Sequence, residues 1–221
     1  MSPMHIFLII LVFAGIFHII AIIYGKETLR RISKCFLMPL LLAAYLSGGS
    51  NICVITALVF GWLGDVFLLN KIKTTYFILG LVSFLLGHIC YIAAFIQVLG
   101  VSGALAANIN IPAFLIFTPP SVALSFVIFR LIKPTIEMRI PVILYIAVLI
   151  TMSFTGFQVF LSNLGVAGLL ILSGCFNFMV SDTILAYYTF RKPKVYGSVL
   201  LMSFYIAAQA EIVLGLFYIN L

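Results

Sequence analysis

Long apolar runs, separated by short connections, dominate this sequence. Most of the runs reach the roughly 20 residues that a helix needs to cross the hydrocarbon core of a bilayer. Only 8% of the residues are charged, whereas a soluble globular domain has about 25%. A water-soluble fold of 221 residues could not cover its surface with so few charges. Lipid around the outside removes this difficulty, so the sequence predicts an all-α, polytopic membrane protein.

We expect a single transmembrane domain over residues 1–221, built as a bundle of about eight transmembrane helices. The expected helices cover residues 4–24, 34–47, 51–70, 74–99, 111–132, 138–161, 165–190 and 195–219. The second expected helix is short, but the positions of the basic residues favour counting it as a transmembrane span. All twelve Lys and Arg residues stand in four connections, at residues 26–34, 71–73, 130–139 and 191–194. If all eight helices span, every basic residue falls on one face of the membrane.

This charge placement also predicts the orientation. The positive-inside rule puts the basic connections in the cytoplasm, and both termini then lie outside. We expect a multi-pass protein of the cell membrane, or of the inner membrane in a bacterium. The formal net charge of +7 comes from these short connections and not from a basic face. We therefore expect membrane lipids and no nucleic acid as partners.

Three of the five acidic residues, Asp65, Asp182 and Glu211, fall inside expected helices. A carboxylate in a membrane span costs about 2.5–3.5 kcal/mol on insertion scales, so each is a candidate functional residue. Counted from the nearest basic connection, Asp65 lies roughly 9 Å and Asp182 roughly 13 Å deep at the helical rise per residue. A structural acid bonded to a neighbouring helix is the alternative for both, and for Glu211 we favour that structural or lipid-edge role.

Other polar residues fall at similar depths and share helix faces. His88 and Tyr91 are three residues apart, and Tyr205 and Gln209 are four apart, so each pair lies on one face. Together with the two aspartates they could line one cavity that opens toward the cytoplasmic leaflet. A packing role is the alternative for His88. One intramembrane His with two Asp residues gives too few ligands for a metal site, so we expect no metal and no cofactor.

Four stretches of the chain resemble the YhhN family of membrane proteins. They are Leu58 to Asp65, which reads LVFGWLGD; Gly80, Phe84, Gly87, His88 and Tyr91; Ser181-Asp182 with Leu185-Ala186; and Tyr205 with Ala208-Gln209. Their order and spacing extend from the third expected helix to the eighth. The characterised members of that family are lysoplasmalogenases. The resemblance therefore implies a hydrolase that cleaves the vinyl-ether bond of a lysoplasmalogen, giving a fatty aldehyde and glycerophosphocholine or glycerophosphoethanolamine.

The chemistry of this bond suits two carboxyl groups. A vinyl ether is cleaved by protonating its β-carbon, which leaves an oxocarbenium ion for water to attack, and this needs an acid, a base and nearby negative charge. Two carboxyls in a low-dielectric site can share one proton. We hypothesise that Asp65 and Asp182 are the catalytic pair, without assigning which is the acid. The expected substrate-binding and orienting residues are His88, Tyr91, Tyr205, Gln209, Asn177 and Ser181.

Two other functions are compatible with buried acids and histidine. A proton-coupled transporter or carrier of a small amphiphile uses the same residue types in proton relays. It predicts acids spread through the membrane and an inverted repeat, neither of which the sequence shows. An assembly protein held together by small-residue interfaces gives no reason for two buried aspartates.

Overall fold

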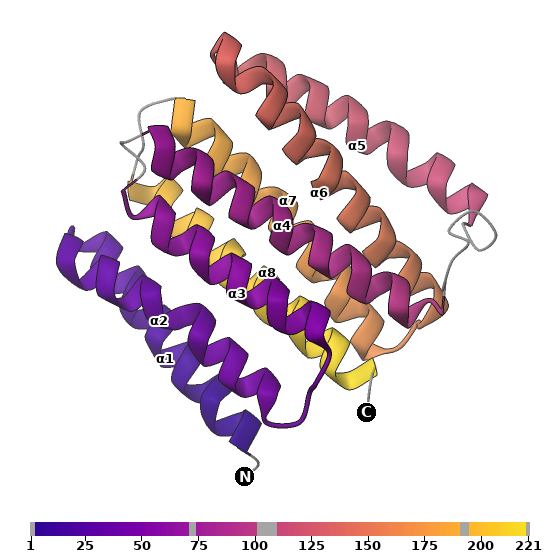
Figure 1. Ribbon diagram of the computed structural model, residues 1–221, viewed down its shortest axis with the longest axis horizontal. Coiled ribbons are helices and arrows are strands. Elements are labelled where there is room, and N and C mark those ends of the chain that lie inside the picture. The colour runs from indigo at the N-terminus through magenta and orange to yellow at the C-terminus, as the bar shows by residue number, and fades with distance from the viewer. Residues whose placement is uncertain (1–2, 71–73, 101–109, 191–194, 220–221) are drawn as a thin grey trace.

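The computed structural model describes residues 3–70, 74–100, 110–190 and 195–219. Eight α-helices and no strands make up this part of the chain (Figure 1). They are α1 (Pro3–Ile23), α2 (Glu27–Leu46), α3 (Ile52–Leu68), α4 (Thr74–Val98), α5 (Ile111–Ile132), α6 (Ile136–Ser162), α7 (Val166–Phe190) and α8 (Val195–Ile219). The prediction of an all-α polytopic membrane protein is confirmed, because α1 and α4 to α8 are long and apolar enough to cross a bilayer.

The helices run alternately up and down and pack in two layers (Figure 1). In that view α3 and α4 lie in front of α7 and α8, with α1 and α2 on one side and α5 and α6 on the other. The closest pairings are α1 with α2, α3 with α4, and α7 with α8. The helix α5 lies at the edge, against α6 and α7. The two ends of the chain lie at the same end of the bundle.

The second helix is longer than the sequence predicts. It begins at Glu27 and not at residue 34, so the residues assigned to a basic connection form its first two turns. Glu27 accepts hydrogen bonds from Arg30 at 2.5 Å and 2.9 Å and from Arg31 at 3.2 Å. These pairs between residues three and four apart support the exposed first turn. The prediction was wrong here because charged residues were taken to end the helix, whereas they only mark where it leaves the lipid.

Short polar residues fix several helix positions. The Asn51 side chain caps α3 by accepting from the Cys53 backbone N–H, and the Asn110 side chain caps α5 in the same way from Ala113. The His18 ring on α1 is fully buried and lies 2.7 Å from the Ser33 hydroxyl on α2. Capping thus fixes the starts of α3 and α5, and the interhelical hydrogen bond joins α1 to α2.

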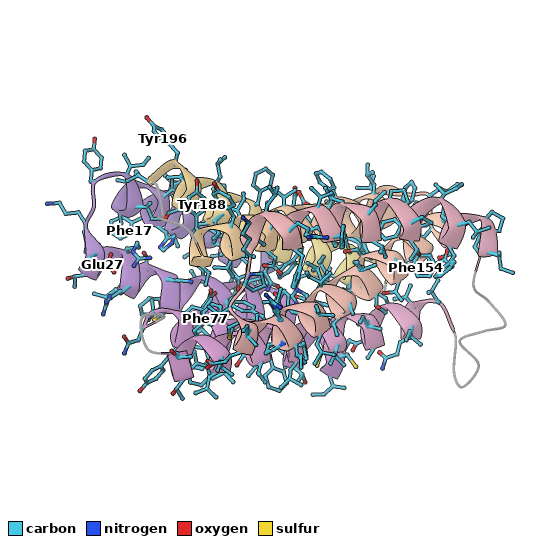
Figure 2. All side chains as sticks on the ribbon, turned by 90° about the horizontal axis from the view of Figure 1, so that it is seen from above. Phe17, Glu27, Phe77, Phe154, Tyr188 and Tyr196 are labelled. Carbon is cyan, nitrogen blue, oxygen red and sulfur yellow. The ribbon has the colours of Figure 1, made fainter. Side chains whose placement is uncertain are left out.

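The sides of the bundle are apolar. Glu27 projects from one end of the molecule, Phe154 lies toward the other, and the side chains drawn between them are mostly carbon (Figure 2). Exposed Ile, Val, Leu and Phe side chains cover the outer faces of α1 and α5. Such a surface is what lipid tails contact in a membrane protein. The side of the membrane that each end faces remains a prediction.

Candidate functional site

A buried acidic group on α3 forms the first half of the site. Asp65 is 2% exposed. Its Oδ1 atom lies 3.1 Å from the ammonium of Lys34 on α2, and its Oδ2 atom accepts a 2.8 Å hydrogen bond from the Tyr205 hydroxyl on α8. Three helices therefore meet at one carboxylate. The cation supplies the counter-charge that a buried carboxylate needs.

Gln209 extends this half toward the middle of the bundle. It lies one turn after Tyr205, and its Oε1 atom accepts a 2.5 Å hydrogen bond from the Tyr91 hydroxyl on α4. Gly61 makes room for it, because a Cβ atom there would lie 3.1 Å from the Gln209 Nε2 atom. Tyr91 and Gln209, one member of each same-face pair that the sequence predicts, thus meet between α4 and α8.

Asp182 on α7 forms the second half. Its Oδ2 atom accepts a 2.6 Å hydrogen bond from the Tyr145 hydroxyl on α6 and lies 3.8 Å from the His88 Nε2 atom on α4. The His88 ring is 1% exposed and packs edge-on against Phe178 and Tyr145. Neither ring nitrogen of His88 has a hydrogen-bond partner among the described residues. A polar side chain buried in this way is free to bind a water molecule or a substrate oxygen.

Aromatic rings connect the two halves of the site. Among the described side chains, no direct hydrogen bond joins one half to the other. The Tyr205 ring contacts Phe84 and Phe178 edge-on, with centroid distances of 5.8 Å and 5.9 Å. Phe178 in turn contacts His88 at 4.7 Å. Each aspartate therefore has its own set of partners. The sharing of one proton between them remains a prediction.

An apolar cavity of about 420 Å³ adjoins the second half. It is bounded by α4, α5, α6 and α7 with Leu68 at the end of α3, and among the described residues Asp182 is the only charged side chain in its wall. The wall comes from one end of each helix: residues 77–84 near the start of α4, 142–150 near the start of α6 and 176–189 near the end of α7. The cavity thus occupies the half of the bundle where Arg130 and Lys133 lie at the end of α5 and Arg139 lies at the start of α6. Its volume is typical of small-molecule sites, which occupy roughly 300–1,000 Å³.

A comparison with protein-family models matches residues 29–216 to the YhhN family. The chain belongs to the YhhN family. The matched region includes both aspartates and every residue described above as their partner. Comparisons with curated proteins and with solved structures find no match.

Two predicted site residues of this YhhN-family chain, Asn177 and Ser181, bond to groups other than the aspartates. Asn177 donates its side-chain N–H to the Glu211 carboxylate at 2.8 Å, and the structural or lipid-edge role of Glu211 remains a prediction. Ser181 donates to the Leu201 carbonyl at 3.3 Å and so joins α7 to α8. Neither contacts Asp65 or Asp182 through a hydrogen bond among the described residues. Their assignment as orienting residues remains a prediction.

The structure adds two residues that the sequence did not indicate as part of the site, Lys34 and Tyr145. Lys34 was placed in a cytoplasmic connection, although it lies on the same face as the buried Leu37, Met38 and Leu41. That spacing of three and four residues was the available signal. Tyr145 gave none, because it stands alone in an apolar helix. Among the described residues, no group of three His, Cys, Asp or Glu side chains could hold a metal ion.

Proposed function

We propose that this protein is a lysoplasmalogenase, a membrane hydrolase that cleaves the vinyl-ether bond of lysoplasmalogens to a fatty aldehyde and glycerophosphocholine or glycerophosphoethanolamine. Membership of the YhhN family and the resemblance of the four motifs to lysoplasmalogenases support it. The observation that carries the proposal is the position of Asp182. Its carboxyl group lies in the wall of an apolar cavity, beside His88, where a lipid chain and a proton donor can meet.

The cavity orients the substrate. The hydrocarbon chain occupies the apolar space between α5, α6 and α7, because burying it there removes it from water and from the headgroup region. The phosphate points toward the end of the bundle that carries Lys133 and Arg130, where cations favour an anionic headgroup. The vinyl ether lies between chain and headgroup, so it comes next to Asp182.

Asp182 acts as the proton donor. It has no Lys or Arg partner among the described residues, and Tyr145 bonds to only one of its two oxygens. The other oxygen can carry the proton that passes to the β-carbon of the vinyl ether. The carbon–carbon double bond becomes single, and the ether oxygen shares the positive charge of the oxocarbenium ion. The Asp182 carboxylate then stabilises this cation at short range.

Water completes the reaction. A water molecule held by His88 attacks the α-carbon and loses a proton to His88 or Asp182. The resulting hemiacetal collapses to the aldehyde when its hydroxyl loses a proton, the glycerol oxygen takes one up, and the bond between that oxygen and the α-carbon breaks. The products are the aldehyde and the glycerophospho headgroup, and the net reaction consumes one water. Asp65, paired with Lys34, lies behind Phe84 and Phe178 and acts on the reacting atoms only at a distance.

Aldehyde release by the purified protein tests the proposal. Wild type, Asp65→Asn and Asp182→Asn are compared in detergent, with Glu211→Gln as the matched control, because Glu211 is also intramembrane but is bonded to Asn177 outside the cavity. We expect Asp182→Asn to lose about a hundredfold or more of the rate, in the range of general acid–base catalysis, Asp65→Asn to lose less because Asp65 does not touch the substrate, and the control to keep the full rate. Near-normal activity in Asp182→Asn would overturn the mechanism. No aldehyde from wild type would overturn the function and favour proton-coupled transport.

A further inference from the structure

Pro39 leaves one backbone carbonyl of α2 without its helical partner. It lies inside the helix, and a proline has no N–H to donate to the carbonyl four residues earlier. That carbonyl belongs to Cys35. An unpaired carbonyl is costly in a bilayer, where no water can replace the lost donor.

The Trp62 side chain on α3 supplies the missing donor. Its indole Nε1–H donates a 3.0 Å hydrogen bond to the Cys35 carbonyl oxygen. The ring is 37% exposed, so one face lies on the surface of the bundle while the N–H points at the neighbouring helix. An aromatic residue that only lined the lipid surface would not need this contact.

The same two helices make the Lys34–Asp65 ion pair at the same level. Lys34 precedes Cys35 on α2, and Asp65 follows Trp62 by three residues, or less than one turn, on α3. The indole–carbonyl bond lies at the outer edge of this interface, and the ion pair lies inside it, where Asp65 is 2% exposed. A long, flexible lysine side chain needs a fixed helix to hold its ammonium at one carboxylate.

We propose that Trp62 is a positioning residue, which fixes α2 on α3 through the carbonyl that Pro39 frees and so holds Lys34 at Asp65. Pro39 and Trp62 act together, because the proline leaves the Cys35 carbonyl unpaired and the indole N–H then donates to that carbonyl. The effect on catalysis rests on the proposed function. The effect on the α2–α3 interface does not.

The first test uses fluorescence, because Trp62 is the only tryptophan of the chain. Pro39→Ala restores an N–H to α2, which then occupies the Cys35 carbonyl and releases the indole. We expect the Trp62 emission to move to shorter wavelength in Pro39→Ala, since the indole loses its hydrogen bond. Pro141→Ala, the same change inside α6, serves as the control and should leave the emission unchanged. Identical emission from wild type and Pro39→Ala would overturn the inference.

The second test is a double-mutant cycle on aldehyde release. Trp62→Phe keeps an aromatic ring but removes the N–H, and we expect about a tenfold loss in kcat with little change in KM, because the Cys35 carbonyl is left unpaired and Lys34 shifts. In the Pro39→Ala background the carbonyl has an internal donor, so Trp62→Phe should cost almost nothing further. An equal loss in both backgrounds would show that Trp62 only packs.

A third readout separates this inference from the proposed function. The coupling between Lys34→Met and Asp65→Asn in thermal unfolding reports the ion pair whether or not the protein hydrolyses anything. We expect this coupling to shrink in Trp62→Phe and also in Pro39→Ala, because each change removes the bond between α2 and α3, and to shrink no further in Trp62→Phe/Pro39→Ala. If the wild type releases no aldehyde but the coupling follows this pattern, the positioning role of Trp62 stands and the proposed reaction is wrong. If the coupling between Lys34→Met and Asp65→Asn is the same in wild type and in Trp62→Phe, Trp62 does not position Lys34.

Discussion

Removing the ammonium of Lys34 is the sharpest perturbation of the first half of the site. Lys34→Met keeps most of the side-chain length but leaves Asp65 buried without its counter-charge. The two side chains are 11% and 2% exposed, so water cannot replace the cation. Breaking one side of a buried pair costs about 3–5 kcal/mol in general. We expect the lower end, about 3 kcal/mol, because the Tyr205 hydrogen bond remains and the carboxyl can take up a proton.

Thermal unfolding in detergent, followed by far-ultraviolet circular dichroism, measures this loss. Lys133→Met makes the same chemical change at an exposed position and should shift stability by less than about 0.5 kcal/mol. Lys34→Met/Asp65→Asn should be more stable than Lys34→Met alone, because a neutral pair no longer buries an unpaired charge. The reasoning is refuted if Lys34→Met is as stable as Lys133→Met, or if Asp65→Asn gives no compensation.

Three further predictions concern the cavity and its wall. Tyr145→Phe should lower kcat about tenfold with KM little changed in steady-state assays, because the lost hydroxyl contacts Asp182 and one hydrogen bond to a charged group contributes about 1.5 kcal/mol or more; a change confined to KM would argue against this. Ile150→Trp should fill part of the cavity, so rates measured on a series of alkenyl chain lengths should fall for long chains first, and a uniform fall would count against the chain site. Gly64→Ala places a Cβ 2.7 Å from the Phe84 ring and should cost about 1–3 kcal/mol in thermal unfolding, whereas an unchanged midpoint would mean that the ring moves freely.

The bundle could be predicted because membrane helices have an unusually simple signal. Apolar length gives the spans of α1 and α4 to α8, whereas the crossing of α2 and α3 rests on the alternation of basic connections and remains a prediction. The start of α2 could not be read in the same way. Glu27, Arg30 and Arg31 pair with one another on one exposed turn, so charge there is compatible with helix. Hydropathy reports where a helix leaves lipid and says little about where it ends.

The polar cluster could be predicted in part, because a buried polar residue in a span stands out. Asp65, Asp182, His88, Tyr205 and Gln209 do converge from four helices. Which side chain contacts which depends on helix rotation and packing, and one sequence does not contain that information. The sequence therefore could not show that Asp65 pairs with a lysine, or that Asp182 alone among these five faces the cavity.

Lys34 and Tyr145 illustrate two different reasons for a missed residue. Lys34 carries a visible pattern, since Leu37, Met38 and Leu41 continue its face as buried residues. Because Lys34 is charged, it was assigned to a connection, although long basic side chains commonly bury their stems beside helix ends. Tyr145 has no polar neighbour at helical spacing, so only its contact with Asp182 identifies it.

The central claim is that an acid in the cavity wall protonates a carbon of the vinyl ether. Running the wild-type reaction in D2O and analysing the released aldehyde by mass spectrometry tests it most directly, with free aldehyde incubated alone to correct for exchange. The account predicts one deuterium on the carbon next to the carbonyl, because the proton donated by Asp182 comes from solvent. An aldehyde that carries only hydrogen at this carbon would contradict it.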